Sequence, residues 1–414
     1  MLGRVRLAAV FAALLLAPAA QAGDSWWRDA VGAGGLALPG PGVPITVIDT
    51  GVDLSHPSFA DRPGATALNV QTVHGAREGH GTAVASVIGL GLYPQARLLS
   101  WYASPSGFFT NGGIASGLEA AAAPGVANLS LGGRSWNRAE ADAVAAAYGR
   151  GIVTVAAAGN DGERDSAASF PADLPHVLTV GSVGRDGQPS AFTTHSRAID
   201  VAAPGEDVLT AVPPDGYATA RGTSVATPFV SASLAWIWTQ RPELDHTQLV
   251  ELVRRTARDV GPPGRDDQTG FGVIDVGAAL AAPAPIPDPL EPNDDVRWAM
   301  TPAPASLAAR IDSVEDVDDV YRIQLAMGTP LRVELRSHHA LGLELWDADT
   351  PTIRATGDVR MAHLLASGRG VSRRQVAVTM NHGRSPATIF VRVRLRPGVE
   401  RASYALWLNG AAPS

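Results

Sequence analysis

Apolar positions along residues 43–282 fall into two alternating kinds of segment. Short, uninterrupted apolar runs predict buried strands, at 43–49, 126–131, 151–158 and 176–183. Stretches with helical spacing or alanine-rich composition predict helices, at 80–90, 112–123, 137–149, 225–239 and 244–257. Asp245 or Thr247 is the expected N-cap of the last helix. Strands that alternate with helices favour an α/β fold with a doubly wound, mostly parallel sheet covered on both faces.

The pattern changes after a proline-rich stretch. Residues 281–292, AAPAPIPDPLEP, contain five prolines, a density that neither a helix interior nor a central strand tolerates. Beyond it, apolar and polar residues alternate with period two over 331–336, 389–396 and 404–408. With no clear helix, this alternation predicts a second, smaller all-β sandwich with a solvated face that carries arginines.

The N-terminus has the three parts of a secretory signal peptide. Arg4 and Arg6 precede an apolar run over 7–16, and AQA follows at 20–22. The apolar run is shorter than the roughly 18 residues that a membrane anchor needs. We therefore expect a secreted or periplasmic protein. The expected parts of the chain are a signal peptide at 1–22, a short N-terminal segment at 23–42, the α/β domain at 43–282, a semi-rigid linker at 283–289 and the sandwich at 290–414.

Composition excludes several classes of protein. The formal net charge of −7 gives no reason to expect nucleic acid or an anionic membrane as a partner. The chain has no cysteine, which excludes cysteine catalysis and thiolate zinc sites. An exported protein without disulfides relies on core burial, or on ions, for its stability. We expect no membrane span and a monomer.

Four polar residues stand at predicted strand ends or helix starts. Asp49 ends VPITVID, His80 lies between two glycines in GHGTAVAS, Asn160 follows AAAG, and Ser224 lies in RGTSVATPF. Each has a structural interpretation by itself: an Asx turn, a buried imidazole, a left-handed turn and an N-cap, with Pro228 tolerated in the first helical turn. A zinc site at His80 is disfavoured, because only His74 is near and no H-E-x-x-H run is present. Taken together, the chain order Asp, His, Ser is the one found in subtilisin.

Five motifs in this region resemble those of subtilisin-like serine proteases. They are VIDTGVD (47–53), GHGTAVAS (79–86), NLSLGG (128–133), AAGN (157–160) and GTSVATP (222–228). The resemblance covers 43–282 and implies a subtilisin-like fold and an exported serine endopeptidase that cleaves polypeptides without a cofactor for the chemistry. It implies that Ser224 is the nucleophile, His80 the general base and Asp49 the residue that orients the imidazole. The side chain of Asn160 and the backbone N–H of Ser224 would bind the oxyanion.

The resemblance also implies a substrate groove. Ser130, Leu131, Gly132 and Gly133 would form an exposed strand edge that pairs with an extended peptide. Ala158 and Gly159 would belong to the opposite wall of the pocket for the side chain before the cleaved bond. Neither wall contains an acid or a base, so we expect a preference for apolar or medium-sized side chains.

The chain departs from the family pattern in two places. Val225 stands where the family usually has methionine, from which we expect altered packing and not inactivity. Only residues 23–42 separate the expected cleavage site from the first strand, which leaves no room for the usual propeptide. Folding would then proceed unaided, with help from the C-terminal domain, or with help from a separate chain.

Structural calcium, which family members often bind, is left open because no clear motif supports it. The candidate acids are scattered without an EF-hand-like loop, and we expect surface turn roles for them. They are Asp53, Asp61, Asp161, Asp173, Asp200, Asp266, Asp267 and the EPNDD of 291–295.

The C-terminal part, 290–414, resembles the bacterial pre-peptidase C-terminal domain. The resemblance rests on DPLEPNDD (288–295) and DVDDVYRIQL (316–325). It suggests a role in export or substrate contact, or later removal of the domain. Two other functions compete with the leading one: a catalytically silent binding protein on a protease fold, and an acid-acting sedolisin-type enzyme, in which a glutamate takes the position of His80.

Overall fold

The computed structural model describes most of the chain, which divides into two compact units between Pro287 and Asp288. The predicted signal peptide at 1–22, Asp61 and His74 lie outside the described residues. The described residues are 25–59, 62, 64–69, 79–104, 109–163, 168–285, 287–288, 290–296, 298–300, 306–313, 316–350, 353, 357–370 and 373–409.

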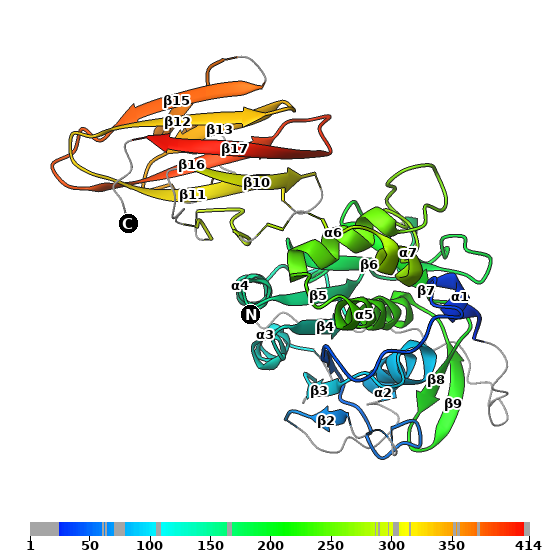
Figure 1. Cartoon of the computed structure of the whole chain (residues 1–414). Helices are drawn as coiled ribbons and strands as arrows, with labels where there is room; N and C mark the ends of the chain where they lie inside the picture. The colour runs from blue at the N-terminus through cyan, green and yellow to red at the C-terminus, as the bar shows by residue number, and fades with distance from the viewer. Residues whose placement is uncertain are drawn as a thin grey trace. The chain divides into compact units, whose positions relative to one another are not determined.

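The first unit is built on a parallel sheet (Figure 1). Within the described residues the sheet has seven strands in the order β2-β3-β1-β4-β5-β6-β7, and all neighbours pair in parallel. The strands are β1 (Ile45–Asp49), β2 (Ala65–Ala67), β3 (Leu98–Tyr102), β4 (Gly125–Leu129), β5 (Ile152–Ala157), β6 (Val177–Val183) and β7 (Ile199–Pro204). A hairpin of β8 (Val208–Val212) and β9 (Gly216–Ala220) follows β7. Strands β1, β4, β5 and β6 are buried along their whole length, which is why they appear in the sequence as continuous apolar runs.

Helices cover both faces of this sheet, so the α/β prediction is confirmed (Figure 1). On one face, an apolar core forms beneath α5 (Thr223–Gln240) together with residues of α2, α6 and α7. On the other face, a separate core packs against α3 and α4. The remaining helices are α1 (Trp26–Ala30), α2 (Gly79–Ser86), α3 (Asn111–Ala120), α4 (Arg138–Gly149), α6 (His246–Thr256) and α7 (Val276–Ala281).

Helix boundaries follow local side-chain chemistry. Asp245 caps α6, and it forms a capping box with Gln248, as the sequence predicts for one of its two candidates. The N-cap of α5 is Gly222, so the alternative interpretation of Ser224 as an N-cap is wrong. Pro228 is the sixth helical residue and lies outside the first turn. The predicted helix 80–90 is α-helical only to Ser86. It continues as a π-helix, η2 (Val87–Leu92).

The segment before β1 belongs to the core of the first unit. Val31 and Ala33 are fully buried within the larger apolar core. The indole N–H of Trp27 donates to the Gly91 carbonyl at 3.0 Å, and Trp27 packs against Phe229 of α5. The described part of this N-terminal segment is therefore a packed element of the unit.

The second unit is a β-sandwich, as predicted. Within the described residues its two antiparallel sheets have four strands each, in the orders β10-β17-β12-β15 and β11-β16-β13-β14, and their facing sides form one apolar core. The strands are β10 (Ser306–Asp312), β11 (Asp318–Leu325), β12 (Pro330–Ser337), β13 (Leu341–Trp346), β14 (Leu364–Ser367), β15 (Arg374–Met380), β16 (Ala387–Leu395) and β17 (Arg401–Asn409).

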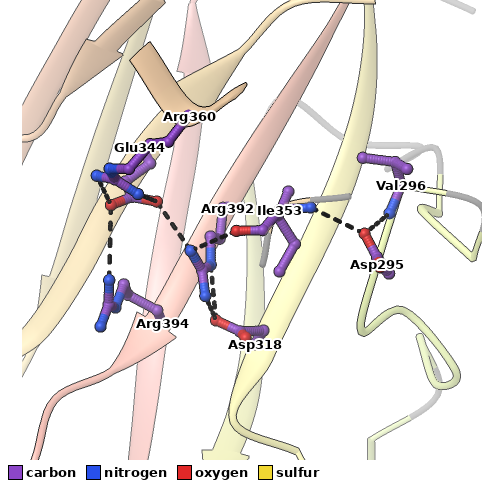
Figure 2. A network of polar contacts seen from close by, with 8 residues as sticks. All are labelled: Asp295, Val296, Asp318, Glu344, Ile353, Arg360, Arg392 and Arg394. Carbon is purple, nitrogen blue, oxygen red and sulfur yellow. Dashed lines mark hydrogen bonds and ion pairs between the residues drawn. The ribbon is translucent and has the colours of Figure 1, made fainter. Parts of the chain in front are cut away.

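The predicted solvated face is confirmed on β12, where the side chains of Arg332 and Arg336 are 44% and 57% exposed, but the outer face of the other sheet is covered. Phe390 packs with Trp346 and Ile353 in a second apolar cluster, and a short helix, α8 (Gly357–His363), interrupts the all-β pattern. Arg392 is only 7% exposed. Its guanidinium donates to Asp318 at 2.7 Å and to Glu344 at 3.0 Å (Figure 2). Alternation alone cannot show that a distant segment covers the polar side of a strand.

No helix in the described parts of the chain is both long enough and apolar enough to cross a membrane.

Candidate active site

Two candidate residues lie at the carboxyl ends of central strands, Asp49 at the end of β1 and Asn160 just after β5. Asp49 is the last residue of β1, and β1 lies between β3 and β4. The chain passes from β1 toward β2 and β3 on one side, and from β4 toward β5 on the other. This makes the boundary between β1 and β4 a topological switch point, where open α/β sheets bind their ligands.

Asp49 and His80 form a buried hydrogen-bonded pair. Nδ1 of His80 lies 2.8 Å from Oδ1 of Asp49, and the Thr50 N–H donates to the same oxygen at 2.7 Å. Asp49 is fully buried and His80 is 7% exposed. Because a carboxylate only accepts, Nδ1 carries the proton, and Nε2 of the neutral ring is left with a lone pair.

Local packing explains why the GHGT segment lies beside the carboxyl end of β1. The N–H of Gly81 donates to Thr50 Oγ1, and the N–H of Asp53 donates to Thr82 Oγ1, both at 2.9 Å. A Cβ atom at Gly81 would lie 2.2 Å from the Gly51 carbonyl oxygen, so only glycine allows α2 to approach the end of β1 this closely. These contacts hold His80 against Asp49.

The surroundings of His80 raise the pKa of its imidazole above the ordinary value. Burial alone would lower that pKa, but the charge of Asp49 and the hydrogen bond to it outweigh burial. Asp49 therefore stabilises the imidazolium that forms when His80 accepts a proton.

Asn160 is held by Thr223, the residue before Ser224. Its Oδ1 accepts from the Thr223 N–H at 2.8 Å and from the Thr223 hydroxyl at 3.0 Å, which assigns the carbonyl and leaves Nδ2 as the donor. A Cβ atom at Gly222 would lie 3.4 Å from Asn160 Nδ2 and 3.2 Å from Ser224 Oγ. Gly222 has φ +143, a backbone conformation that favours glycine.

Ser224 is reachable from solvent and is not yet bonded to the imidazole. The residue is half-buried in the first turn of α5, directly after the β8–β9 hairpin. Among the described residues, no hydrogen bond joins Ser224 Oγ to His80. Catalytic hydrogen bonds are often long or poorly aligned without substrate and tighten in the reacting complex.

The expected exposed edge at 130–133 is wrong for its first two residues. Ser130 and Leu131 are 2% and 4% exposed: Ser130 Oγ accepts from Asn128 Nδ2, and Leu131 packs in the core beneath α3 and α4. Gly132 is half-buried, and the next residue, Gly133, pairs antiparallel with Phe170. Part of the edge that a peptide would use is thus occupied by the chain itself.

The opposite wall carries a charge pair that the sequence did not suggest. Ala158 is buried and Gly159 half-buried, with the Gly159 N–H donating to Thr223 Oγ1. Asp161, directly after Asn160, is 3.3 Å from Arg134, which follows Gly133. An ion pair therefore links the two segments expected to form the pocket walls.

The residues that position the candidate groups were not predicted from the sequence. Thr50, Thr82 and Thr223 each lie within a recognised motif, and their hydroxyls make the contacts described above. Asn128 also belongs here, since its Oδ1 accepts from Ser231 of α5. The only indication in the sequence is that each of these threonine and asparagine residues lies within a motif. Their hydrogen-bond partners come from other segments of the chain and cannot be predicted from the sequence.

The acids considered for calcium in this unit have protein partners. Asp53 accepts from Ser55, Asp173 from Ser196, and Asp266 from Thr269. Asp200 is fully buried and its Oδ1 is 2.9 Å from Arg254. A surface turn is therefore the wrong description for Asp53 and Asp200, which are 1% and 0% exposed.

Comparison with known proteins identifies the class. The profile of the Subtilase family matches residues 40–272. Subtilisin Savinase of Lederbergia lenta is 34% identical over 255 residues, which cover 58% of this chain and 92% of that protein. Subtilisin DY of Bacillus licheniformis is 34% identical over 253 residues, covering 58% of this chain and 91% of that protein.

A solved structure agrees with these sequence matches. A cold adapted subtilisin-like serine proteinase superposes with a TM-score of 0.54 and 30% sequence identity, over 61% of this chain and 97% of that one. The chain belongs to the subtilase family. It is a subtilisin-like serine endopeptidase, and its substrates are polypeptides.

Proposed function

We propose that Asp49, His80 and Ser224 are the catalytic triad of an exported endopeptidase. Ser224 Oγ attacks the scissile carbonyl while His80 Nε2 takes its proton, and His80 then gives that proton to the leaving amine. Asp49 keeps Nδ1 protonated, so that Nε2 faces the serine as a base. Water hydrolyses the acyl-enzyme by the same route. The 2.8 Å contact between Asp49 and His80 is the observation that carries this proposal.

Asn160 Nδ2 and the Ser224 backbone N–H are the proposed donors to the oxyanion. Support comes from Thr223, which occupies Asn160 Oδ1 and so leaves Nδ2 available as the donor. A neutral donor stabilises the developing negative charge and, unlike a cation, adds no charge beside His80.

The substrate backbone would lie along Gly132, and the side chain before the cleaved bond would lie between the two walls. Ala158 and Gly159 contribute the second wall, and Ser130 and Leu131 support the first from beneath. The apolar character of these residues favours an apolar or medium-sized side chain before the cleaved bond. The ion pair of Asp161 with Arg134 offsets the acidic charge near this wall.

Export and the C-terminal unit complete the proposal. Residues 1–22 would direct secretion to the periplasm or medium, and the protein would act as a monomer with no cofactor for the chemistry. The C-terminal unit would be a pre-peptidase C-terminal domain that contacts substrate or is later removed. The family match itself ends at residue 272.

The test compares two serine variants on a diverse peptide library read by mass spectrometry. Ser224→Ala should abolish cleavage, and Ser135→Ala, at an exposed position, should leave it intact. The wild-type products also report the preferred side chain. Equal cleavage by Ser224→Ala would overturn the triad, and wild-type protein that binds peptides without cutting them would favour the silent binding protein.

A further inference from the structure

The ion pair between Arg134 and Asp161 joins the two segments that form the walls of the proposed substrate pocket. Nη2 of Arg134 lies 3.3 Å from Oδ2 of Asp161. Arg134 follows Gly133 on one wall, and Asp161 follows the proposed oxyanion donor Asn160 on the other. The two side chains are 50% and 44% exposed, so both are open to solvent. The pair therefore lies at the surface between the walls and does not belong to the buried core.

The residues beneath the pair hold the walls close together. The Gly133 N–H donates to the Phe170 carbonyl at 2.9 Å, and the Phe170 N–H donates to the Gly133 carbonyl at 2.7 Å. A Cβ atom at Gly132 would lie 2.8 Å from Ser169 Oγ and 4.0 Å from the Ala157 carbonyl oxygen. These five residues carry no charge, so they cannot select a substrate side chain by its charge.

The carboxylate of Asp161 lies beside the second wall. A Cβ atom at Gly159 would lie 3.9 Å from Asp161 Oδ2, the oxygen that contacts Arg134. The Asp161 backbone is held there, because its N–H donates to Thr194 Oγ1 at 3.0 Å and the Thr194 N–H donates to the Gly159 carbonyl at 3.0 Å. A substrate side chain that enters between the walls would therefore pass both charges.

The two charges act in opposite directions on a charged substrate side chain. Asp161 alone would attract a lysine or arginine side chain, and Arg134 alone would attract an acidic one. Because the charges are only 3.3 Å apart, their effects on a third, more distant charge largely cancel. Exposed charges interact weakly in water, but a bound substrate displaces part of that water and strengthens the interaction. Removing one member of the pair should then change the preference for a charged side chain by about tenfold.

We propose that Arg134 is a specificity-determining residue, and that its ion pair with Asp161 is a charge filter that restricts the enzyme to neutral side chains before the cleaved bond. The inference rests on the proposed function, in which that side chain lies between these two walls. It adds that the neutral preference comes from two opposite charges that cancel, and not from walls without charge.

The experiment measures kcat/KM on peptides that differ only in the residue before the cleaved bond, which is leucine, lysine or glutamate. The full chain is compared with Arg134→Gln, with Asp161→Asn and with the double variant. The control combines Arg138→Gln with Asp142→Asn, which removes an exposed ion pair of 3.5 Å within α4 that does not join the walls. Labelling of Ser224 by a fluorophosphonate gives the active concentration of each protein.

Arg134→Gln should raise kcat/KM for the lysine peptide about tenfold relative to the leucine peptide, because Asp161 is left uncompensated. Asp161→Asn should raise the value for the glutamate peptide in the same way. High salt should reduce both gains, since salt screens exposed charges. The double variant and the control should keep the wild-type preference.

Unchanged preferences in both single variants would overturn the charge filter, and so would gains of equal size in the control. A failure of the proposed function gives a different result. In that case the wild-type protein would neither be labelled on Ser224 nor cleave the leucine peptide, and the inference would fall with the triad.

Discussion

Buried carboxylates in the two units are stabilised in different ways. In the catalytic unit, Asp49 contacts His80 and Asp200 contacts Arg254, so each buried acid has a nitrogen partner within the chain. At the start of the C-terminal unit, Asp316 and Asp319 have other carboxylates as their main neighbours. Burying a charge is costly unless it is paired. The comparison shows that a nitrogen partner contacts each of the first two acids, whereas burial and neighbouring carboxylates raise the pKa of Asp316 and Asp319 well above the ordinary value.

The largest effect is expected from Asp49→Asn. The amide can present an N–H to His80 and so favour the wrong tautomer, and it removes the charge that stabilises the imidazolium. We expect kcat to fall by about 10⁴-fold with little change in KM. Steady-state kinetics of peptide hydrolysis measures both constants. The control is Asp173→Asn, which removes a carboxylate from a turn in the same unit. Activity within tenfold of wild type would contradict the role of Asp49.

Loss of Arg392 should destabilise the C-terminal unit strongly. Arg392→Met leaves Asp318 and Glu344 buried without their shared guanidinium, which costs about 3–5 kcal/mol. Arg394→Met is the matched control, because Arg394 is 3.7 Å from Glu344 and more exposed, and it should cost less than about 1 kcal/mol. Urea unfolding of both variants in the Ser224→Ala chain gives the difference. Equal costs would show that the buried network is not responsible.

Asn160→Ala should reduce kcat by about 10²- to 10³-fold, the range found for this type of donor in subtilisin. The loss should appear in kcat more than in KM, because the oxyanion exists only in the transition state. Steady-state kinetics on one peptide substrate measures both constants. An effect confined to KM would place Asn160 in substrate binding.

A smaller effect is expected at Thr223. Thr223→Val removes the hydroxyl that donates to Asn160 Oδ1 and accepts from the Gly159 N–H. The backbone N–H of residue 223 still holds the amide, so we expect about a tenfold loss of kcat, near the value of one hydrogen bond. Thr223→Ser keeps the hydroxyl and should retain activity. A serine variant as slow as the valine variant would show that the methyl group matters instead.

The sequence predicted the catalytic unit well because its signals are local. Continuous apolar runs identified the central strands, and Asp245 marked the start of α6. Five motifs in family order identified the fold and the four candidate residues. Each of these signals lies within a few consecutive residues.

The sequence failed where the environment comes from distant segments. Arg392 has the spacing of a solvated position, yet a segment containing Ile353 covers it. Ser130 and Leu131 directly follow a strand and were predicted to form an exposed edge, but both are buried. Glu291 and Asp294 were expected in a surface turn and are buried. Residues predicted to be exposed, in turns or at strand edges, are buried by contacts with distant segments, which no local sequence pattern encodes.

His80 makes the pH dependence of the protein informative. A raised pKa in the folded state contributes stability that is complete below about pH 6.5 and is lost as the pH rises through the raised value. The pH dependence of catalysis is opposite to that of stability, since only the neutral imidazole can accept the proton of Ser224. Activity should therefore increase with pH through a midpoint above 6.5, whereas a rate maximum near pH 4 would indicate sedolisin-type chemistry.

The central claim is that His80 activates Ser224, and the rate of fluorophosphonate labelling against pH tests it most directly. We predict a single adduct on Ser224, formed at a rate that rises with one ionisation above pH 6.5 and becomes negligible in His80→Ala. Labelling that is independent of pH and equally fast in His80→Ala, or an adduct on another residue, would contradict it.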